Sequence, residues 1–201
     1  ECPSNTDPGK FIRQLRLKNL KGAAATVKRN NVLGAVCGLL CPTCTLCQQG
    51  CVAAGLGQPI DIGKLQYFAV EHAWNIGFSA LRRGAPNGKR VAVIGAGPSG
   101  LSCAAELAQQ GFAVVVFERL DRPGGILAHI LPEHRCPADI LEREIAEIVA
   151  LGVEIRCNQS IASDADIERL LAEGFSAVFV GTGAWTSQRL GIPGSEQDGV
   201  M

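Results

Sequence analysis

A strand, a glycine-rich turn and a helix follow one another in the middle of this chain. The apolar run Arg90 to Ile94 predicts a short buried strand, and Gly95-Ala-Gly-Pro-Ser-Gly100 places the pattern G-x-G-x-x-G directly after it. Residues Pro98 to Gln110 then predict a helix. This order favours a βαβ unit in which the N-terminus of the helix faces the phosphates of a dinucleotide.

Each glycine of the pattern has its own steric role. Gly95 permits the tight turn, Gly97 lets the backbone approach a pyrophosphate, and Gly100 allows the helix to pack closely on the strand. Glu118 ends the next predicted strand, 23 residues after Gly95, where a carboxylate can accept hydrogen bonds from ribose hydroxyls. The predicted cradle also includes the intervening residues Ala96, Pro98 and Ser99.

Two later glycine motifs favour FAD over NAD(P) as the bound dinucleotide. Arg122-Pro-Gly-Gly125 follows the acidic residue, and a second glycine pair there is more typical of FAD-binding reductases than of simple dehydrogenases. Val178 to Gly183 predicts a strand that ends in a Gly-x-Gly turn, so that Gly183 is expected to pass close to the flavin's phosphates or ribityl chain. An ordinary strand-to-loop turn is the alternative at this second motif.

The chain divides at the turn residues 84–89 into a helical part and an alternating part. We expect domains at residues 1–86 and 87–201. Downstream, strands and helices alternate with short connections, which predicts a doubly wound parallel, Rossmann-like sheet. The expected strands are 113–118, 153–156 and 177–181, and the expected helices are 138–150 and 164–171.

Upstream residues predict only helices and loops. An apolar stripe from Phe11 to Leu20, a segment Ala23 to Arg29 and a helix from Lys64 to about Ala80 are expected to flank a cysteine-rich loop. The third helix is predicted because Leu65, Phe68, Ala69, His72 and Ile76 recur at helical spacing.

Five of the nine cysteines lie in the seventeen residues Ala35 to Cys51. Thiols at this spacing can converge on an iron-sulfur cluster. Zinc is an alternative, although paired C-x2-C knuckles with a longer spacer are absent. A dithiol active site of a disulfide reductase is a second alternative, but such a motif normally lies inside the flavoprotein fold rather than before it.

Composition and charge limit the possible partners and cellular compartments of the protein. Residues 1–88 carry ten Lys or Arg against four Asp or Glu, and residues 89–201 carry nine against fifteen. The basic residues are scattered through helical segments, so we expect no nucleic-acid partner, and no apolar run is long enough to span a membrane. Clustered thiols without a leader peptide favour a reducing, cytoplasmic setting. The last residues read as a loop that runs into more chain, so we expect part of a longer protein.

Four motifs in order resemble the flavoprotein subunit of dihydropyrimidine dehydrogenase and, more broadly, the small subunit of NADPH-dependent glutamate synthase. The motifs are the Cys2-Pro segment, the cysteine loop, Pro59-Ile-Asp-Ile-Gly-Lys-Leu-Gln66 and the sequence GAGPSG. The resemblance implies a helical 4Fe-4S domain followed by a truncated FAD-binding domain.

The resemblance also implies cluster ligands. One 4Fe-4S cluster would be held by three thiolates and an amide oxygen, which are supplied by Cys2, Cys41, Cys47 and Gln66. Cys51 matches a ligand of a second cluster, whose other ligands lie upstream of the Cys-Pro motif in the family. Cys37 and Cys44 remain doubtful ligands, and Cys103 and Cys157 are expected to be small core residues.

For the flavin, the family pattern maps onto Gly95 to Ser99, Glu118, Gly124 and Gly125. It continues through three further positions, Leu131, Arg135 and Ile161. Cys136 stands where the family commonly has leucine. The NAD(P)H-binding domain would follow residue 201, so no nicotinamide-binding residue can be named.

These observations predict an oxidoreductase that passes electrons from NAD(P)H through FAD and 4Fe-4S clusters to a partner. The partner, a subunit or domain in a hetero-oligomer, would reduce a pyrimidine base or, in glutamate synthase, an iminoglutarate intermediate. No residue of this half is expected to act as a catalytic acid, base or nucleophile. The competing hypothesis is a docking module without enzymatic activity that holds zinc or free thiols.

Overall fold

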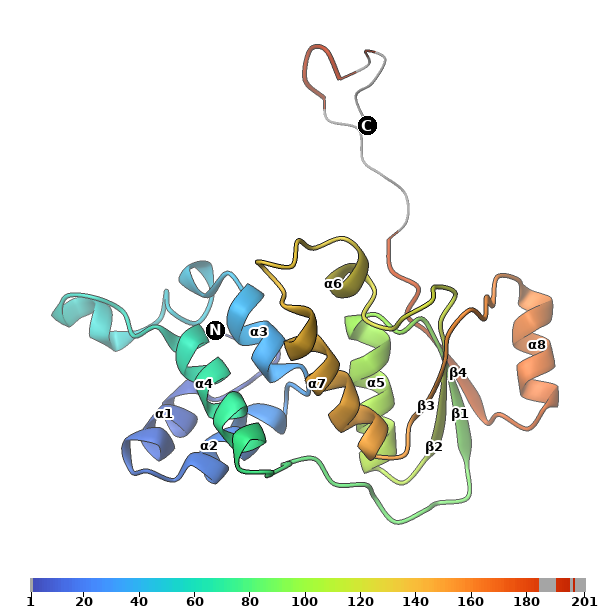
Figure 1. Ribbon diagram of the computed structural model, residues 1–201, viewed down its shortest axis with the longest axis horizontal. Coiled ribbons are helices and arrows are strands. Elements are labelled where there is room, and N and C mark those ends of the chain that lie inside the picture. The colour runs from blue at the N-terminus through green and yellow to red at the C-terminus, as the bar shows by residue number, and fades with distance from the viewer. Residues whose placement is uncertain (1, 185–190, 196, 198–201) are drawn as a thin grey trace.

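A helical half is followed by a half built on a parallel sheet (Figure 1). The computed structural model describes residues 2–184, 191–195 and 197. The predicted fold class is confirmed. A single hydrophobic core runs through both halves, from Phe11 and Val70 in the helices to Val93 and Ile148 in the sheet half.

The helical half begins with two short helices that polar side chains cap. Asp7 accepts from the amide of Lys10 at the start of α1, and Asn19 accepts from the amide of Gly22 at the start of α2. Local sequence therefore places both helix starts. The helices are α1 (Pro8–Arg16), α2 (Leu20–Lys28), α3 (Gly34–Leu40) and α4 (Ile62–Asn75), with short 3-10 turns at Thr43–Thr45 and Val52–Leu56.

Helices α3 and α4 pack unusually close together. A Cβ on Gly38 would lie 2.7 Å from the carbonyl oxygen of Gly63, so only glycine fits at this crossing. The buried face of α4 therefore includes Gly63 and Val70, whereas Phe68 and Ile76 are each 46% exposed. The apolar residues at helical spacing therefore do not all face the core. Helix α3 itself was expected to be part of a loop.

The start of α4 provides a first test of local stability. The carboxylate of Asp61 accepts from the amide of Lys64 at 3.2 Å and pairs with its ammonium at 3.0 Å. We expect Asp61→Ala to lower the free energy of unfolding by about 1 kcal/mol, and Asp61→Asn, which keeps the acceptor, by much less. Denaturant titration checks both values, and an equal loss in the two variants would contradict the assignment.

The same contact predicts a pH dependence. Hydrogen bonds from Lys64 lower the pKa of Asp61 below its ordinary value of 3.8. A lowered folded-state pKa means that the stabilisation is present above this ordinary value and is lost as the pH falls through the lowered pKa. The Asp61→Asn variant should lack this component.

Four parallel strands form the second half. Strand β1 (Arg90–Ile94) lies between β2 (Ala113–Phe117) and β4 (Ala177–Val180), and β3 (Glu154–Arg156) pairs with β2, giving the order β3-β2-β1-β4. The remaining helices are α5 (Pro98–Gln109), α6 (Ile126–His129), α7 (Ala138–Ala150) and α8 (Asp164–Ala172).

Alternate residues of the strands enter two different layers. Val93, Val114 and Val116 join the main core with α5 and α7, whereas Val115 and Phe117 join a second cluster with Leu170 and Phe175, on the side of α8. Figure 1 shows α5 and α7 between the sheet and the N-terminal helices, so these two helices connect the halves. In the described part of the chain, no helix combines the length and apolar character needed to cross a membrane.

Candidate functional site

The glycine-rich turn forms a tight backbone cradle at the carboxyl end of β1. Gly95 has a φ of +97°, and a Cβ at this position would lie 2.5 Å from the carbonyl oxygen of Gly181. A Cβ on Gly100 would clash with the carbonyl oxygen of Gly95, so the first turn of α5 rests directly on the strand end. Each of these two glycines is thus required by a measured close approach.

The N-terminus of α5 is left available for an anion. Gly97 is its N-cap residue and provides no side-chain cap, and Pro98 occupies the first turn. Uncapped N–H groups and the positive end of the helix dipole at this point suit a phosphate. The structure therefore places the predicted residues Ala96 to Ser99 around one helix end.

Glu118 is buried beside this turn. One carboxylate oxygen accepts from the amide of Ala96 at 2.7 Å, and the other accepts from the amide of Leu120 at 2.9 Å. The side chain is thereby fixed at the carboxyl end of β2, and each oxygen keeps a lone pair for a further donor such as a ribose hydroxyl.

The second glycine pair folds onto the first motif. The amide of Gly124 donates to the carbonyl oxygen of Ala96 at 2.8 Å. Gly125 has a φ of +55°, and a Cβ there would lie 2.8 Å from the Cα of Gly97. The two motifs thus form one structure, and residues Gly95, Ala96, Gly97, Gly124 and Gly125 are neighbours.

The remaining predicted flavin residues lie on three other segments, which follow β4, follow α6 and precede α8. Gly181 directly follows β4, and its amide donates to the carbonyl oxygen of Ile94 at 2.8 Å. Gly183, two residues later, has a φ of +78°. Leu131 is half-buried against the core, and Arg135 is exposed on the segment that leaves α6. No contact places either side chain in the cradle.

Ile161 lies on the side of the sheet that faces α8. It packs against the Phe117 cluster and lines a cavity of about 350 Å³ together with Phe117, Arg156 and Gln159. The amide of Gln159 donates to the backbone carbonyl oxygen of Glu118 at 2.8 Å, which links one lining residue of this cavity to the end of β2.

Substitution of Glu118 tests the cradle. Glu118→Ala leaves the buried amide of Ala96 and the partly buried amide of Leu120 without an acceptor and removes the carboxylate, so we expect dinucleotide affinity to fall about 10- to 100-fold. Isothermal titration with FAD measures the change. Glu168→Ala, on the exposed face of α8, is the matched control and should bind as the unchanged chain does.

Three other thiols lie within electrostatic range of Cys41, the residue that follows the last turn of α3. Burial, followed by the neighbouring thiol of Cys37 and then by Cys47 and Cys2, raises the pKa of Cys41 to about 11. Burial and the charges of Cys2 and Cys37 also raise the pKa of Cys47. The predicted ligands Cys2, Cys41 and Cys47 therefore lie within electrostatic range of one another, and the doubtful Cys37 lies among them.

Gln66 reaches the same helix from α4. Its amide nitrogen donates to the carbonyl oxygen of Gly34, in the first turn of α3, at 2.7 Å, and the side chain is buried. This bond uses the amide nitrogen and not the amide oxygen, and it lies at the first turn of α3, whereas Cys41 follows the last turn. Three soft thiolates with one amide oxygen fit the chemistry of an iron-sulfur cluster. As they stand in the described residues, no three His, Cys, Asp or Glu side chains are placed to hold a metal ion.

The other cysteines differ in environment. Cys51 begins the turn Val52–Leu56, and backbone amides, first that of Ile60, lower the pKa of its thiol. Cys44 is exposed, Cys103 is half-buried against the core, and Cys157 follows β3 and is only half-buried. The nine cysteines are all free thiols.

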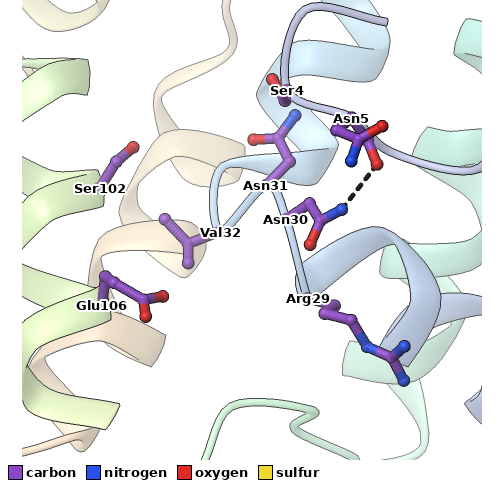
Figure 2. A pocket seen from close by; sticks show the side chains of 8 residues that line it. All are labelled: Ser4, Asn5, Arg29, Asn30, Asn31, Val32, Ser102 and Glu106. Atoms are coloured by element: carbon purple, nitrogen blue, oxygen red, sulfur yellow. Dashed lines mark hydrogen bonds between the residues drawn. The ribbon is translucent and has the colours of Figure 1, made fainter. Parts of the chain in front are cut away.

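A cavity of about 580 Å³ lies apart from both sets of residues. Figure 2 shows its lining from three segments, residues 4–5, residues 29–32 and the α5 residues Ser102 and Glu106, with Asn30 donating to the carbonyl oxygen of Asn5 at 2.6 Å. Its lining is mostly polar and exposed, and it contains none of the predicted site residues.

Two family models match the chain. Residues 1–78 match dihydropyrimidine dehydrogenase domain II, 4Fe-4S cluster, and residues 93–141 match an NAD(P)-binding Rossmann-like domain. The first match contains the four gathered thiols and Gln66, and the second contains the glycine cradle and Glu118.

Curated relatives are similar along nearly the whole chain. The NAD-dependent dihydropyrimidine dehydrogenase subunit PreT of Escherichia coli strain K12 is 44% identical over 199 residues, which is 99% of this chain and 48% of the relative. The same subunit of Salmonella typhimurium is 42% identical over 196 residues, covering 98% and 47%. The glutamate synthase [NADPH] small chain of Escherichia coli is 30% identical over 201 residues, covering 100% and 42%. The expected resemblance is confirmed, and the chain spans about half the length of these relatives.

Proposed function

Because residues 1–78 match the dihydropyrimidine dehydrogenase domain II family and the whole chain is similar to PreT subunits, we propose that it is the iron-sulfur and FAD-binding part of an oxidoreductase. NAD(P)H would reduce FAD, and 4Fe-4S clusters would pass single electrons to a partner subunit or domain that reduces a pyrimidine base. Bound FAD supplies the step from a two-electron donor to one-electron carriers.

The observation that supports this proposal most strongly is the shared core. The helices that carry the gathered thiols and the strand that carries the glycine cradle bury side chains in one hydrophobic cluster. A relay between two cofactors needs a fixed separation, and a continuous core provides it.

Individual residues have the following proposed roles. Cys2, Cys41, Cys47 and Gln66 hold one cluster, and Cys51 contributes to a second. Residues Gly95 to Gly100 bind the pyrophosphate, Glu118 orients the ribose, and Gly124, Gly125 and Gly183 bring the backbone close to the cofactor. Leu131, Arg135 and Ile161 complete the flavin site. The proposed domains are residues 1–86 and 87–201.

The FAD assignment is supported by the packed second glycine pair. A simple pyrophosphate turn needs only the first motif, whereas here Gly125 contacts Gly97 and Gly124 is bonded to Ala96. We also propose that the protein acts in the cytoplasm, because its nine free thiols suit a reducing compartment.

Metal and flavin analysis of the anaerobically purified chain tests the proposal. We expect about four iron and four sulfide for the cluster assigned to Cys2, Cys41, Cys47 and Gln66, and one FAD per chain. Zinc without iron would instead favour a docking module. Flavin without iron, with thiol titration coupled to flavin reduction, would favour a disulfide reductase.

The glutamate synthase relationship gives a second candidate. The 30% identity to the small chain extends over the whole sequence and motivates it. NAD(P)H oxidation by the full-length protein with its partner separates the two, since uracil should stimulate it in one case and glutamine with 2-oxoglutarate in the other.

A further inference from the structure

A buried ionic network joins the two halves of the molecule. The ammonium of Lys28, the last residue of α2, lies 3.0 Å from Glu144 and 2.6 Å from Glu147, both on α7. It also donates to the carbonyl oxygen of Val32 at 2.7 Å. Lys28 is 2% exposed and Glu144 is 0% exposed, so the pair is removed from solvent.

The second oxygen of Glu144 caps the cysteine-bearing helix. It accepts from the amide of Ala35, in the first turn of α3, at 2.6 Å. Leu33, the N-cap residue of α3, provides no side-chain cap of its own. A carboxylate at this end of the helix satisfies an amide and interacts favourably with the helix dipole.

Two side chains therefore hold the same turn of α3 from opposite halves of the protein. Gln66 of α4 donates to the carbonyl oxygen of Gly34, and Glu144 of α7 accepts from the adjacent residue. Helix α7, which carries Glu144, also packs against α5, whose N-terminus forms the pyrophosphate cradle. At its other end α3 leads to Cys41.

Burying the charges of Lys28 and Glu144 costs free energy, and a gain in stability alone does not explain why charged residues stand here. Burial raises the pKa of Glu144, opposed by the charge of Lys28. Apolar residues of similar volume often stabilise as well as a buried ion pair does. A directional acceptor for one amide of α3, however, is something that an apolar side chain cannot provide.

We propose that Glu144 is a positioning residue, with Lys28 as its counter-ion, that fixes the cysteine helix α3 against the nucleotide-binding half. On the proposed function, which this inference rests on, it sets the separation between the cluster and the flavin. Electron transfer depends steeply on that separation.

A matched pair of double variants isolates the acceptor. Lys28→Met with Glu144→Gln is uncharged and keeps an oxygen for the amide of Ala35, whereas Lys28→Met with Glu144→Leu is uncharged and has none. Both remove the charges of Lys28 and Glu144 and leave Glu147 in place, and only the glutamine variant keeps an acceptor for the amide of Ala35.

Two measurements are made on the anaerobically loaded protein. We expect the amide of Ala35 to exchange at least about tenfold faster in the leucine variant than in the glutamine variant. We also expect flavin-to-cluster electron transfer to slow at least about tenfold in the leucine variant, at unchanged iron and flavin content. Equal transfer rates in the two loaded variants would overturn the proposal, and so would equal exchange at Ala35.

Two additions keep the test decisive. If the leucine variant does not fold, Glu144→Asp, which is shorter by one methylene, replaces it, and exchange and transfer rates equal to those of the unchanged chain would overturn the proposal. If the unchanged chain binds neither iron nor flavin, the proposed function fails, while the exchange of Ala35 still tests the capping contact by itself.

Discussion

The Cys41→Ser chain is expected to bind at least about tenfold less iron and sulfide than the unchanged chain after anaerobic reconstitution. Cys41 lies at the end of α3, within electrostatic reach of three other thiols, so it occupies the centre of the proposed ligand set. A serine hydroxyl remains protonated at neutral pH and is a poor ligand for iron. Colorimetric iron and sulfide assays, with the visible absorption of the cluster, measure the loss.

Two other cysteines provide controls for this substitution. Cys44 is exposed, and Cys103 lies on α5 against the core, so serine at either position removes a thiol without touching the ligand set. Both variants should retain full iron content. Iron retained by Cys41→Ser, or lost equally in all three variants, would contradict the assigned ligands.

Gly95→Ala is expected to weaken FAD binding at least about 100-fold, or about 2.7 kcal/mol. The φ of +97° is already unfavourable for alanine, and its Cβ would lie 2.5 Å from the carbonyl oxygen of Gly181. The turn must therefore shift at the point where it receives the pyrophosphate. Equilibrium dialysis against FAD measures the affinity.

Gly174→Ala separates backbone strain from the lost cradle. Gly174 has a φ of +91°, close to that of Gly95, but a Cβ there meets nothing within 4 Å. Both variants should lose about 1–3 kcal/mol of folding free energy from strain. Only Gly95→Ala should lose FAD, and equal affinities in the two variants would show that Gly95 does not shape the site.

The sequence predicted the sheet half well because its signals are local. Strand β1 and helix α7 have the predicted bounds, since an apolar run before a glycine turn and a strong helical period each depend on neighbouring residues. Helix α3 was missed for the opposite reason. Its first turn is capped by Glu144, which lies 109 residues after Ala35 in sequence, so no nearby residue indicates the helix start.

The inward face of α4 was also beyond local reasoning. The apolar period pointed to Phe68 and Ile76, but α3 approaches on the side of Gly63, where the absence of a side chain allows close contact. Such a contact is a property of two helices together. The aromatic side chain of Phe68 is left partly exposed as a result.

The candidate sites also combine features that local sequence predicts with contacts between distant residues that it does not. The cradle residues from Gly95 to Gly100 and Glu118 were predicted because the motif is contiguous and the carboxylate ends the next strand. The contact between Gly95 and Gly181 depends on β4 pairing with β1, which the sequence alone does not specify. The link through Lys28 and Glu144 joins residues 116 positions apart, and no motif marks either one.

Electron transfer from flavin to cluster within one molecule is the most direct test of whether the two halves form a single relay. The chain is loaded anaerobically with cluster and FAD, the flavin is reduced by light in the presence of a sacrificial donor, and the reduced cluster is followed by freeze-quench paramagnetic resonance. We expect cluster reduction to be first order, with a rate constant unchanged over an about tenfold range of protein concentration. A rate that rises in proportion to concentration, or a cluster that stays oxidised beside reduced flavin, would contradict the relay.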